Sequence, residues 1–380
     1  MRRGARAIGK KLSKNAMDFL TFFKITPEPF ALDLSDRSIK IIKFARKRGE
    51  FFLENFGELN IDPGLMEDGA ILDEAKLASA VRDAIMNLKK GPLKTPYAAC
   101  SLPEQRTYLR VIQLPKMEEK DVVNAVQWEV EANVPVPLNE LYFDYQVIKP
   151  LANHTDHLDI LVSAAPRSLV EGYVKLFSAA GLKPFSFEPE SVALARALVK
   201  GGVAQKPTLI VDLGRTRTSF LVYAGRGLRL SSSVKLSGAV ITENIMRALK
   251  VDEEEAVRLK EEVGINPKEN GALYEAIIPA LTDFKEQVQK YIEFYYKSSG
   301  HTHGSVAEIG KILLVGGGAR IWGFDKYLAV ALGIPVEIAN PWVNILKPPL
   351  KEVPELAFGE STRYATAIGL ALGTVQNVKT

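Results

Sequence analysis

The chain has 380 residues, of which 47% are hydrophobic and 25% are charged. This is the composition of an ordinary globular protein, and the length is sufficient for two or more domains with cores of their own. The single cysteine, Cys100, excludes an internal disulfide and suits a reducing compartment. No run reaches the roughly 18 apolar residues of a membrane span, and none resembles the apolar region of a signal peptide.

Positive charge is concentrated at the N-terminus. Residues 1–30 carry seven Lys or Arg against two acidic residues, a net charge of +5, so the remainder sums to about −1 because the whole chain is +4. A neutral body argues against nucleic-acid binding, which requires a basic face.

The same N-terminal segment has apolar residues at helical spacing. They are Ala5, Ile8, Leu12, Ala16, Phe19, Leu20 and Phe23. We predict that residues 1–28 form a basic amphipathic arm on an anionic membrane surface. A disordered tail or a helix docked on the body explains the pattern equally well.

In chain order, the first predicted elements form an α/β layer. Phe30–Phe44 predicts a β-hairpin, and Phe51–Leu59 predicts a strand. A helix is expected from Asp73 to a stop at Gly91-Pro92, and Tyr97–Leu102 forms the next strand.

Residues 105–165 have a different order of predicted strands and helices. We predict a strand at Tyr108–Leu114, a helix at Glu118–Asn133, and strands at Leu141–Ile148 and Leu158–Ala164. This strand–helix–strand–strand order indicates a compact insert.

The rest of the chain returns to alternating predicted helices and strands. A helix at Ser168–Ala180, a strand at Pro184–Phe187 and a helix at Glu190–Lys200 precede a natural hinge at Gly201-Gly202. A second β-hairpin is predicted at Thr208–Val222. The later predicted strands are Leu228–Lys235, Lys311–Val315 and Pro335–Ile338, and the later helices begin at Ser237 or span Asp252–Gly264, Leu273–Lys297, Gly323–Leu332 and Tyr364–Leu372. Pro279 should kink the long helix or mark its first turn.

The two hairpins share a pattern that suggests chemistry. Each has an apolar strand that ends in Asp-Leu, at Asp33 and at Asp212, 179 positions apart. An Asp at a strand end can hold hydrated Mg²⁺, while Gly and Thr in the turn offer donors to a phosphate. Two copies at half-chain spacing predict two similar domains that face each other across a cleft.

A third element follows a buried strand late in the chain. Ile312–Val315 leads into Gly316, Gly317 and Gly318. Three glycines between a strand and a helix allow the backbone to approach a ligand and to direct amide groups at it.

Together, the two hairpins, the late glycine loop and the small-residue closing helix resemble the actin, Hsp70 and sugar-kinase ATPase fold. Within it the chain resembles most the PilM family of type IV pilus assembly proteins, with the cell-division FtsA family next. The resemblance covers residues 30 to about 375, and its carriers are VQWEVEANVPVPLNELYFDYQVI and ILLVGGGARIWGFDKYLAVALGIPVEIANPW. It implies an α/β fold of two RNase H-like domains that face a nucleotide cleft, with a small inserted subdomain.

The resemblance also implies a division of the chain. The implied subdomains are 1A at 29–104 and 166–204, 1C (an SHS2 domain) at 105–165, 2A at 205–240 and 305–380, and 2B at 241–304.

Site residues follow from the same resemblance. ATP with Mg²⁺ is the implied cofactor, with Asp33 and Asp212 holding the metal through water. The implied nucleotide-binding residues are Asp33, Ser35, Lys40, Asp212, Gly214, Thr216, Thr218, Lys260, Gly316, Gly317 and Gly318. Glu190 resembles the catalytic acidic residue near the attacking water.

Three departures from the family pattern weaken the expectation of hydrolysis. Ser35 stands in place of the usual glycine, and Val257 stands in place of a glutamate. Arg215 and Arg217 are unusual in the second turn, where they could clamp phosphate or substitute for a missing ligand. We expect nucleotide binding with weak or absent ATPase activity.

The resemblance implies a cytoplasmic scaffold, peripheral to the inner membrane, that docks the N-terminal peptide of a PilN-like membrane protein in a cleft between 1A and 1C. Other platform proteins of a pilus or type II secretion machine are implied partners, and the arm would add affinity for anionic lipid. The alternatives are an ATP-hydrolysing sugar-kinase-like enzyme and a polymerising FtsA-type division scaffold. FtsA carries its membrane helix at the C-terminus, whereas the basic helix here is N-terminal.

Overall fold

A computed structural model describes residues 28–47, 50–149, 157–298, 308–346 and 353–376. Nearly all of the predicted basic arm lies outside these residues, so its membrane role stays a prediction. Among the described helices, none combines the length and the apolar character that crossing a bilayer requires.

The first sheet is built around the first Asp-bearing hairpin. Its strand order is β10-β6-β1-β2-β3, with β1 antiparallel to β2 and parallel to β6. The bounds are Phe30–Ser35 (β1), Ser38–Lys47 (β2), Glu50–Asn60 (β3), Tyr97–Leu102 (β6) and Lys183–Pro189 (β10). Because β1 is covered on both faces, its residues from Phe30 to Leu34 are all buried.

The second sheet repeats this arrangement around the second hairpin. Its order is β13-β12-β11-β14-β15, with β11 antiparallel to β12 and parallel to β14. The bounds are Ala204–Leu213 (β11), Thr218–Gly225 (β12), Gly227–Val234 (β13), Lys311–Val315 (β14) and Val336–Ile338 (β15). The expected α/β architecture with two similar sheets is confirmed.

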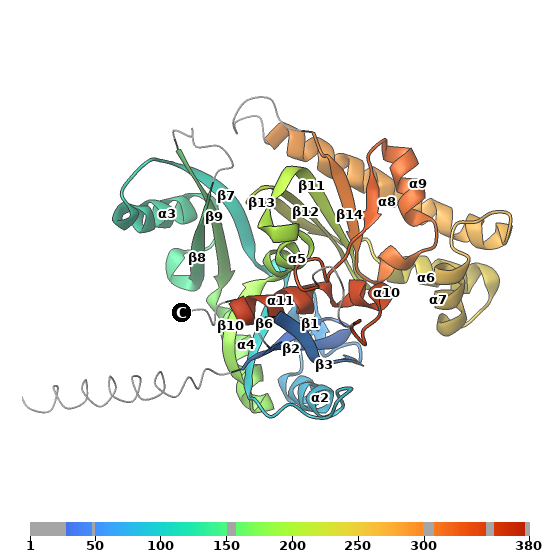
Figure 1. Ribbon diagram of the computed structural model, residues 1–380, viewed down its shortest axis with the longest axis horizontal. Helices are drawn as coiled ribbons and strands as arrows, with labels where there is room; N and C mark the ends of the chain where they lie inside the picture. Colours follow the sequence, from blue (N-terminus) through green and yellow to red (C-terminus); the bar gives the residue numbers. More distant parts are fainter. Residues whose placement is uncertain (1–27, 48–49, 150–156, 299–307, 347–352, 377–380) are drawn as a thin grey trace, which may run out of the picture.

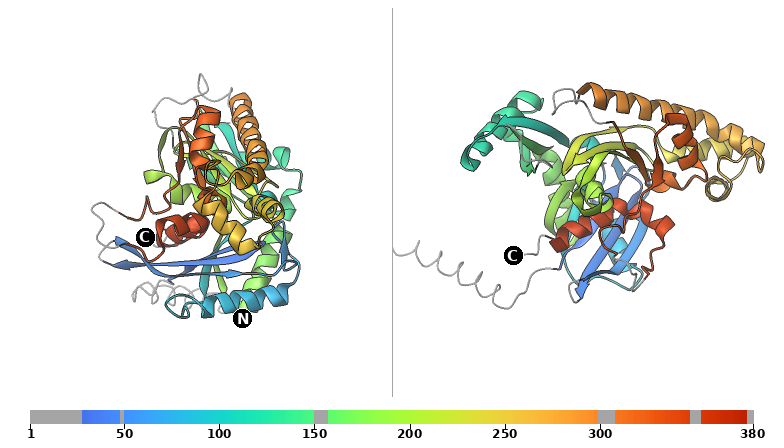
Figure 2. Two further views of the ribbon diagram at one scale, coloured as in Figure 1. Left: turned by 90° about the vertical axis from the view of Figure 1, so that its right-hand side faces the viewer. Right: turned by 45° about the horizontal axis from the view of Figure 1, so that its top comes forward.

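Helices form three layers about the two sheets (Figures 1 and 2). The outer face of the first sheet packs on α2 (Glu74–Met86) and α4 (Arg167–Ala180). The outer face of the second packs on α6 (Gly238–Leu249), α8 (Gly271–Ser298) and α9 (Phe324–Leu332). Between the sheets lie α5 (Glu190–Leu198) and α11 (Ala365–Gln376), which share one core with residues of both sheets.

The predicted insert forms a separate small sheet. Its order is β7-β9-β8, from Tyr108–Pro115 (β7), His157–Pro166 (β9) and Leu141–Ile148 (β8), and α3 (Glu119–Asn133) packs on one face. The order strand–helix–strand–strand is the predicted one, while the subdomain boundaries stay a prediction.

Three local expectations were wrong or incomplete. The helix that begins after Asp73 ends at Met86, before the expected stop at Gly91-Pro92. The long helix begins at Gly271, so Pro279 is inside α8 and not in its first turn. The short strands β4 (Met66–Glu67) and β5 (Ala70–Ile71) and the short helix α10 (Phe358–Ser361) were not predicted, whereas α7 (Glu253–Glu262) lies within a predicted helix.

The contact between α5 and α11 predicts a sensitive position. A Cβ added to Gly369 would collide with the backbone carbonyl of Ala193, which cannot move aside as a side chain can. We expect Gly369→Ala to lower the free energy of unfolding by about 1–3 kcal/mol, the usual cost of overpacking. Thermal or urea denaturation measures this.

The matched control is Gly172→Ala in α4, where an added Cβ meets no atom within 4 Å. Alanine has the higher helix propensity, so this variant should gain up to about 1 kcal/mol. Equal losses in the two variants would contradict the proposed tight contact.

Candidate functional site

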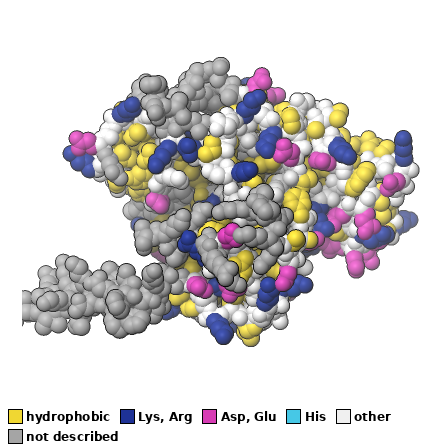
Figure 3. All heavy atoms as spheres, viewed as in Figure 1, with side chains coloured by type: hydrophobic (Ala, Val, Ile, Leu, Met, Phe, Trp, Pro, Cys, Tyr) yellow, Lys and Arg dark blue, Asp and Glu magenta, His cyan; other side chains and the backbone are white. Residues whose placement is uncertain are grey.

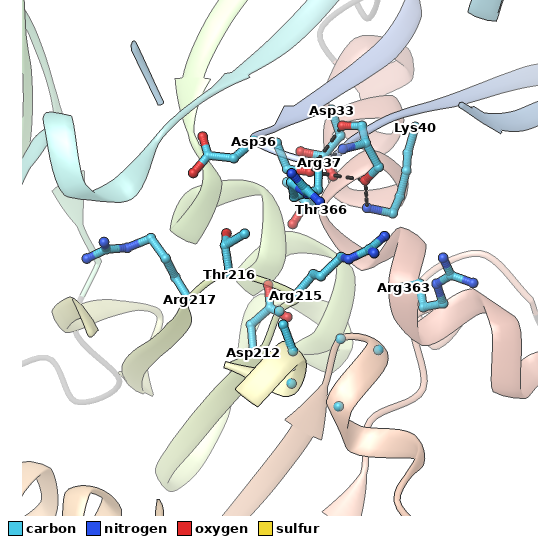
Figure 4. Close-up of a pocket in the computed structure, with 18 of the residues that line it drawn as sticks. Asp33, Asp36, Arg37, Lys40, Asp212, Arg215, Thr216, Arg217, Arg363 and Thr366 are labelled. Carbon is cyan, nitrogen blue, oxygen red and sulfur yellow. Dashed lines mark hydrogen bonds between the residues drawn. The ribbon is translucent and has the colours of Figure 1, made fainter. Parts of the chain in front are cut away.

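The turns of the two hairpins face each other across one cleft (Figure 4). The cleft is lined by residues of both turns, of the glycine loop that enters η4 (Gly317–Arg320), of α7 and of the N-terminal ends of α5 and α11. Of the predicted site residues, those that line it are Asp33, Ser35, Lys40, Glu190, Asp212, Gly214, Thr216, Lys260, Gly316, Gly317 and Gly318.

Thr218 is the exception, and the structure corrects the expectation that it faces a phosphate. Its side chain is fully buried at the start of β12. Its hydroxyl donates to the backbone carbonyl of Leu236 at 2.6 Å, so the donor is already used inside the protein.

Carboxylates gather at the floor of the cleft. Asp33 lies near the C-terminal end of β1 and accepts a hydrogen bond from the Ser101 hydroxyl at 2.8 Å. Burial raises the pKa of Asp33, and Lys40 opposes this. Burial, with the negative charge of Asp33, raises the pKa of Asp212 to about 6. The pKa of Glu190 is raised well above its usual range by burial and then by Asp33.

This acidic floor suits a hydrated cation. In the described part of the chain, no three His, Cys, Asp or Glu side chains come close enough to hold a metal ion directly. A divalent cation would therefore be held with oxygen ligands that include water and a ligand phosphate, which is how Mg²⁺ is usually bound. Asp33 and Asp212, at two strand ends, supply carboxylates of the type that Mg²⁺ prefers.

The first turn uses its serine differently from the expectation. The Ser35 hydroxyl accepts from the backbone N–H of Ser38 at 3.2 Å and lies 3.0 Å from the Ser38 hydroxyl. The side chain is therefore folded into the turn and closes it. Lys40 donates to the same Ser38 hydroxyl at 2.8 Å, which holds the ammonium beside the turn.

The second turn is closed by backbone contacts with its own residues and with α6. The Gly214 N–H donates to the Arg217 carbonyl, and the Gly238 N–H at the start of α6 donates to the Gly214 carbonyl, each at 2.9 Å. A side chain at Gly214 would come within 2.9 Å of the Arg217 carbonyl oxygen. Glycine is required there by this close approach.

The arginines of the second turn are both paired with acidic residues. The Arg215 guanidinium lies 2.6 Å from Glu253 of α7, and that of Arg217 lies 2.9 Å from Asp68 in the β4–β5 turn. Figure 4 shows these two side chains extending to opposite sides of the cleft. They are held by protein carboxylates in this conformation and are not oriented together as a phosphate clamp.

Sequence reasoning missed two further cations that line the cleft, Arg37 and Arg363. Arg37 lies in the first turn, so that both turns contain arginine, as DLSDRS and DLGRTR show. That likeness was a signal that could have identified Arg37. Arg363 carries no local signal, since it reaches the cleft through a 2.9 Å ion pair with Glu58, which is 305 positions away.

The glycine loop and Lys260 form the other end of the cleft. Gly316 has φ +86°, and a Cβ there would collide with the Asp212 carboxylate, so the loop can pass this strand end only as glycine. Lys260 is buried, donates to the Thr242 hydroxyl at 2.8 Å, and has its pKa lowered by burial.

Comparison with known proteins places this geometry in a family. The sequence pattern of the family described as type IV pilus assembly protein PilM matches residues 31–375. A solved structure described as the PilM-PilN type IV pilus biogenesis complex contains a similar chain, with a TM-score of 0.74 at 25% identity, covering 92% of this chain and 98% of that chain.

Two more distant structures share the fold. The ethanolamine utilization protein EutJ from Carboxydothermus hydrogenoformans has a TM-score of 0.52 at 16% identity, covering 91% of this chain and 90% of its own. MreB 5 of Spiroplasma citri, bound to AMPPNP, has a TM-score of 0.52 at 12% identity, covering 92% and 96%. The expected actin-like fold is confirmed.

The raised pKa of Asp212 predicts a pH-dependent stability. Its carboxyl holds its proton more tightly in the folded protein, with a pKa of about 6, than in the unfolded chain, near 3.8. Stability from this group is therefore present at low pH and lost as pH rises from about 4 to 6. We expect Asp212→Asn without ligand to melt at a higher temperature than the wild type above pH 6, and the difference to shrink toward pH 4.

Asp212→Ala is the control for packing. The packing contacts that Asp212→Ala loses should lower the melting temperature by the same amount at every pH. The pH dependence of its melting temperature should therefore match that of Asp212→Asn. A difference between wild type and Asp212→Asn that stays constant from pH 4 to 7 would contradict the raised pKa.

Proposed function

The chain belongs to the PilM family of type IV pilus assembly proteins, and we propose that it serves pilus assembly as a nucleotide-binding docking protein. It binds Mg-ATP in the cleft and a peptide of an inner-membrane partner on the small sheet. The observation that carries the first part is the convergence of two Asp-bearing hairpins and a glycine loop on one cleft.

Several features of the cleft support nucleotide binding. The N-terminal ends of α5 and α11 open on it, which favours an anion there. MreB 5 of Spiroplasma citri, which has the same fold, was solved bound to AMPPNP. In this chain the glycine loop and Lys260 would hold the nucleoside, and the two turns would hold the phosphates.

The arrangement favours binding over rapid hydrolysis. Bound Mg²⁺ would neutralise phosphate charge between Asp33 and Asp212. Glu190 opens α5 at the cleft, where it could orient water. Burial and its acidic neighbours raise the pKa of Glu190 well above the usual range, which favours the protonated carboxyl, and a protonated carboxyl cannot act as a general base. We therefore propose a slow or absent ATPase.

The second part concerns a groove where the small sheet meets the first domain. It lies between the end of α3, the start of β8 and the first residue of α4, Arg167. Its apolar lining is Val134, Pro135, Val136, Pro137, Leu138, Leu141 and Phe143. Figure 3 shows hydrophobic side chains gathered over this part of the molecule.

Strand pairing makes this groove suitable for a peptide. β8 pairs with β9 alone, so one of its edges is unpaired among the described strands. An extended segment can add to such an edge through backbone hydrogen bonds while its apolar side chains enter the groove. The related complex contains PilN. We propose that the N-terminal peptide of a PilN-like inner-membrane protein docks here.

The proposed PilN-like partner also indicates where in the cell the protein works. A protein that docks on the cytoplasmic peptide of an inner-membrane protein works in the cytoplasm, peripheral to that membrane. The basic arm would add attraction to anionic lipid. Other platform proteins of the pilus, or of a related type II secretion machine, are further proposed partners.

Nucleotide binding is tested by thermal shift. At 100 times its Kd, Mg-ATP should stabilise the folded wild type by about 2.7 kcal/mol, a clear rise in melting temperature. Asp212→Ala should show little or no rise relative to its own ligand-free melting temperature, because it lacks one of the two metal-side carboxylates. Mg²⁺ alone is the ligand control, and an unchanged wild type with Mg-ATP would refute the nucleotide proposal.

Peptide docking is tested by fluorescence polarisation with a labelled N-terminal peptide of a PilN-like protein. Pro135 is an exposed residue of the groove, so Pro135→Arg should weaken binding at least tenfold by placing a charge among apolar contacts. Val123→Arg is the matched control, because Val123 is exposed on α3 outside the groove. Equal binding by the two variants would exclude this groove.

A further inference from the structure

The β4–β5 turn joins the two phosphate hairpins on one rim of the cleft. It is fixed in the first domain by Asp36 of the first turn, whose two carboxylate oxygens accept the backbone N–H groups of Asp68 at 3.0 Å and Gly69 at 2.9 Å. The Asp68 carbonyl accepts from Arg106 at 2.6 Å. The turn is therefore held from both sides by its own domain.

This fixation projects one carboxylate into the second domain. Asp68 has φ +47°, a left-handed conformation that is uncommon for a residue with a side chain. Its two oxygens receive Arg217 at 2.9 Å and Lys235 at 2.8 Å, both from the second domain. These cations hold the pKa of Asp68 below its usual range, Lys235 most strongly.

Arg217 is preorganised for this contact. It belongs to the second phosphate turn, and its Nε donates to the Ser233 hydroxyl of β13 at 2.8 Å. Its side chain is only 17% exposed, so the ion pair is partly shielded from water and is stronger than a fully exposed one.

We propose that Asp68 is a positioning residue that clamps the second phosphate turn to the first and so keeps the cleft closed at the spacing that phosphate binding requires. The clamp acts before any ligand arrives, since every group in it belongs to the chain. Its effect on nucleotide affinity rests on the proposed function, whereas its effect on closure does not. In this role Asp68 does not contact the phosphate itself: it acts by holding Arg217.

The test variant is Asp68→Asn. Asparagine tolerates the left-handed conformation, so the turn is kept while the charge is removed. The matched control is Asp73→Asn. Asp73 also pairs with a lysine, Lys76 at 3.0 Å, but within one domain, and asparagine still caps α2.

Closure is measured without nucleotide, by electron spin resonance distances between labels on Met86→Cys in α2 and Val330→Cys in α9. These side chains are 61% and 87% exposed, and the native Cys100 is fully buried and stays unlabelled. We expect Asp68→Asn to give a longer or broader distance distribution and Asp73→Asn to match the wild type. A distribution in Asp68→Asn identical to the wild type would overturn the clamp, whether or not the protein binds ATP.

A double variant tests the pairing itself. Arg217→Gln should also widen the distribution, and Asp68→Asn combined with Arg217→Gln should be no wider than Asp68→Asn alone, because both changes break the same ion pair. Independent, additive effects would refute the pairing as the cause.

Affinity gives the second readout. We expect Asp68→Asn to raise the Kd for Mg-ATP about fivefold, which corresponds to about 1 kcal/mol, with no change in Asp73→Asn. A widened cleft with an unchanged Kd would overturn the link to phosphate binding while leaving closure intact. A wild type that binds no Mg-ATP would refute the proposed function and also this link, and the distances would still decide the clamp.

Discussion

The close packing of α5 against α11 is the constraint on which the rest of the molecule depends. These two helices fill the space between the sheets, and Gly369 lies against the Ala193 carbonyl where no side chain fits. Arg196 of α5 reinforces the contact by donating to the Gly369 carbonyl at 2.9 Å and to Glu188 of β10. Both helices begin at the cleft, so one packing contact sets the sheet spacing and also directs two helix N-termini at the same place.

The cleft has carboxylates on its floor and cations on its rims. Its floor holds Asp33, Asp212 and Glu190, and burial raises the pKa of all three, while the negative charge of Asp33 further raises those of Asp212 and Glu190. Such a floor is costly when ionised and gains most from a divalent cation. The cations Arg215, Arg217 and Arg363 are instead paired with protein carboxylates on the rims. These arginines therefore hold the rims in position, and two of the ion pairs, Arg217–Asp68 and Arg363–Glu58, join the two domains across the cleft.

Most of the architecture was predictable from the sequence, because its signals are local. Apolar strands that end in Asp-Leu identified both hairpins, and the helices predicted to end at Ala180 and Leu332 do end there, each followed by a glycine in the left-handed conformation. The side-chain roles of Thr218 and Ser35 were less predictable, because hydroxyl orientation depends on which backbone group is near. The Asp68–Arg217 pair had no signal at all, since its members are 149 positions apart and meet only when the domains pack.

One strand connects the two proposed activities. Ser233 of β13 accepts a hydrogen bond from Arg217 at the cleft, and Arg229 of the same strand lies 2.5 Å from Asp159 of β9 in the small sheet. Asp159 is buried, so this ion pair is well shielded from water. A strand in a paired sheet moves as a unit, and a rotation that separates Arg217 from Asp68 also displaces Arg229. Since the proposed peptide edge, β8, is bonded directly to β9, β13 gives a continuous path of contacts from the rim of the cleft to the strands that carry the proposed docking groove.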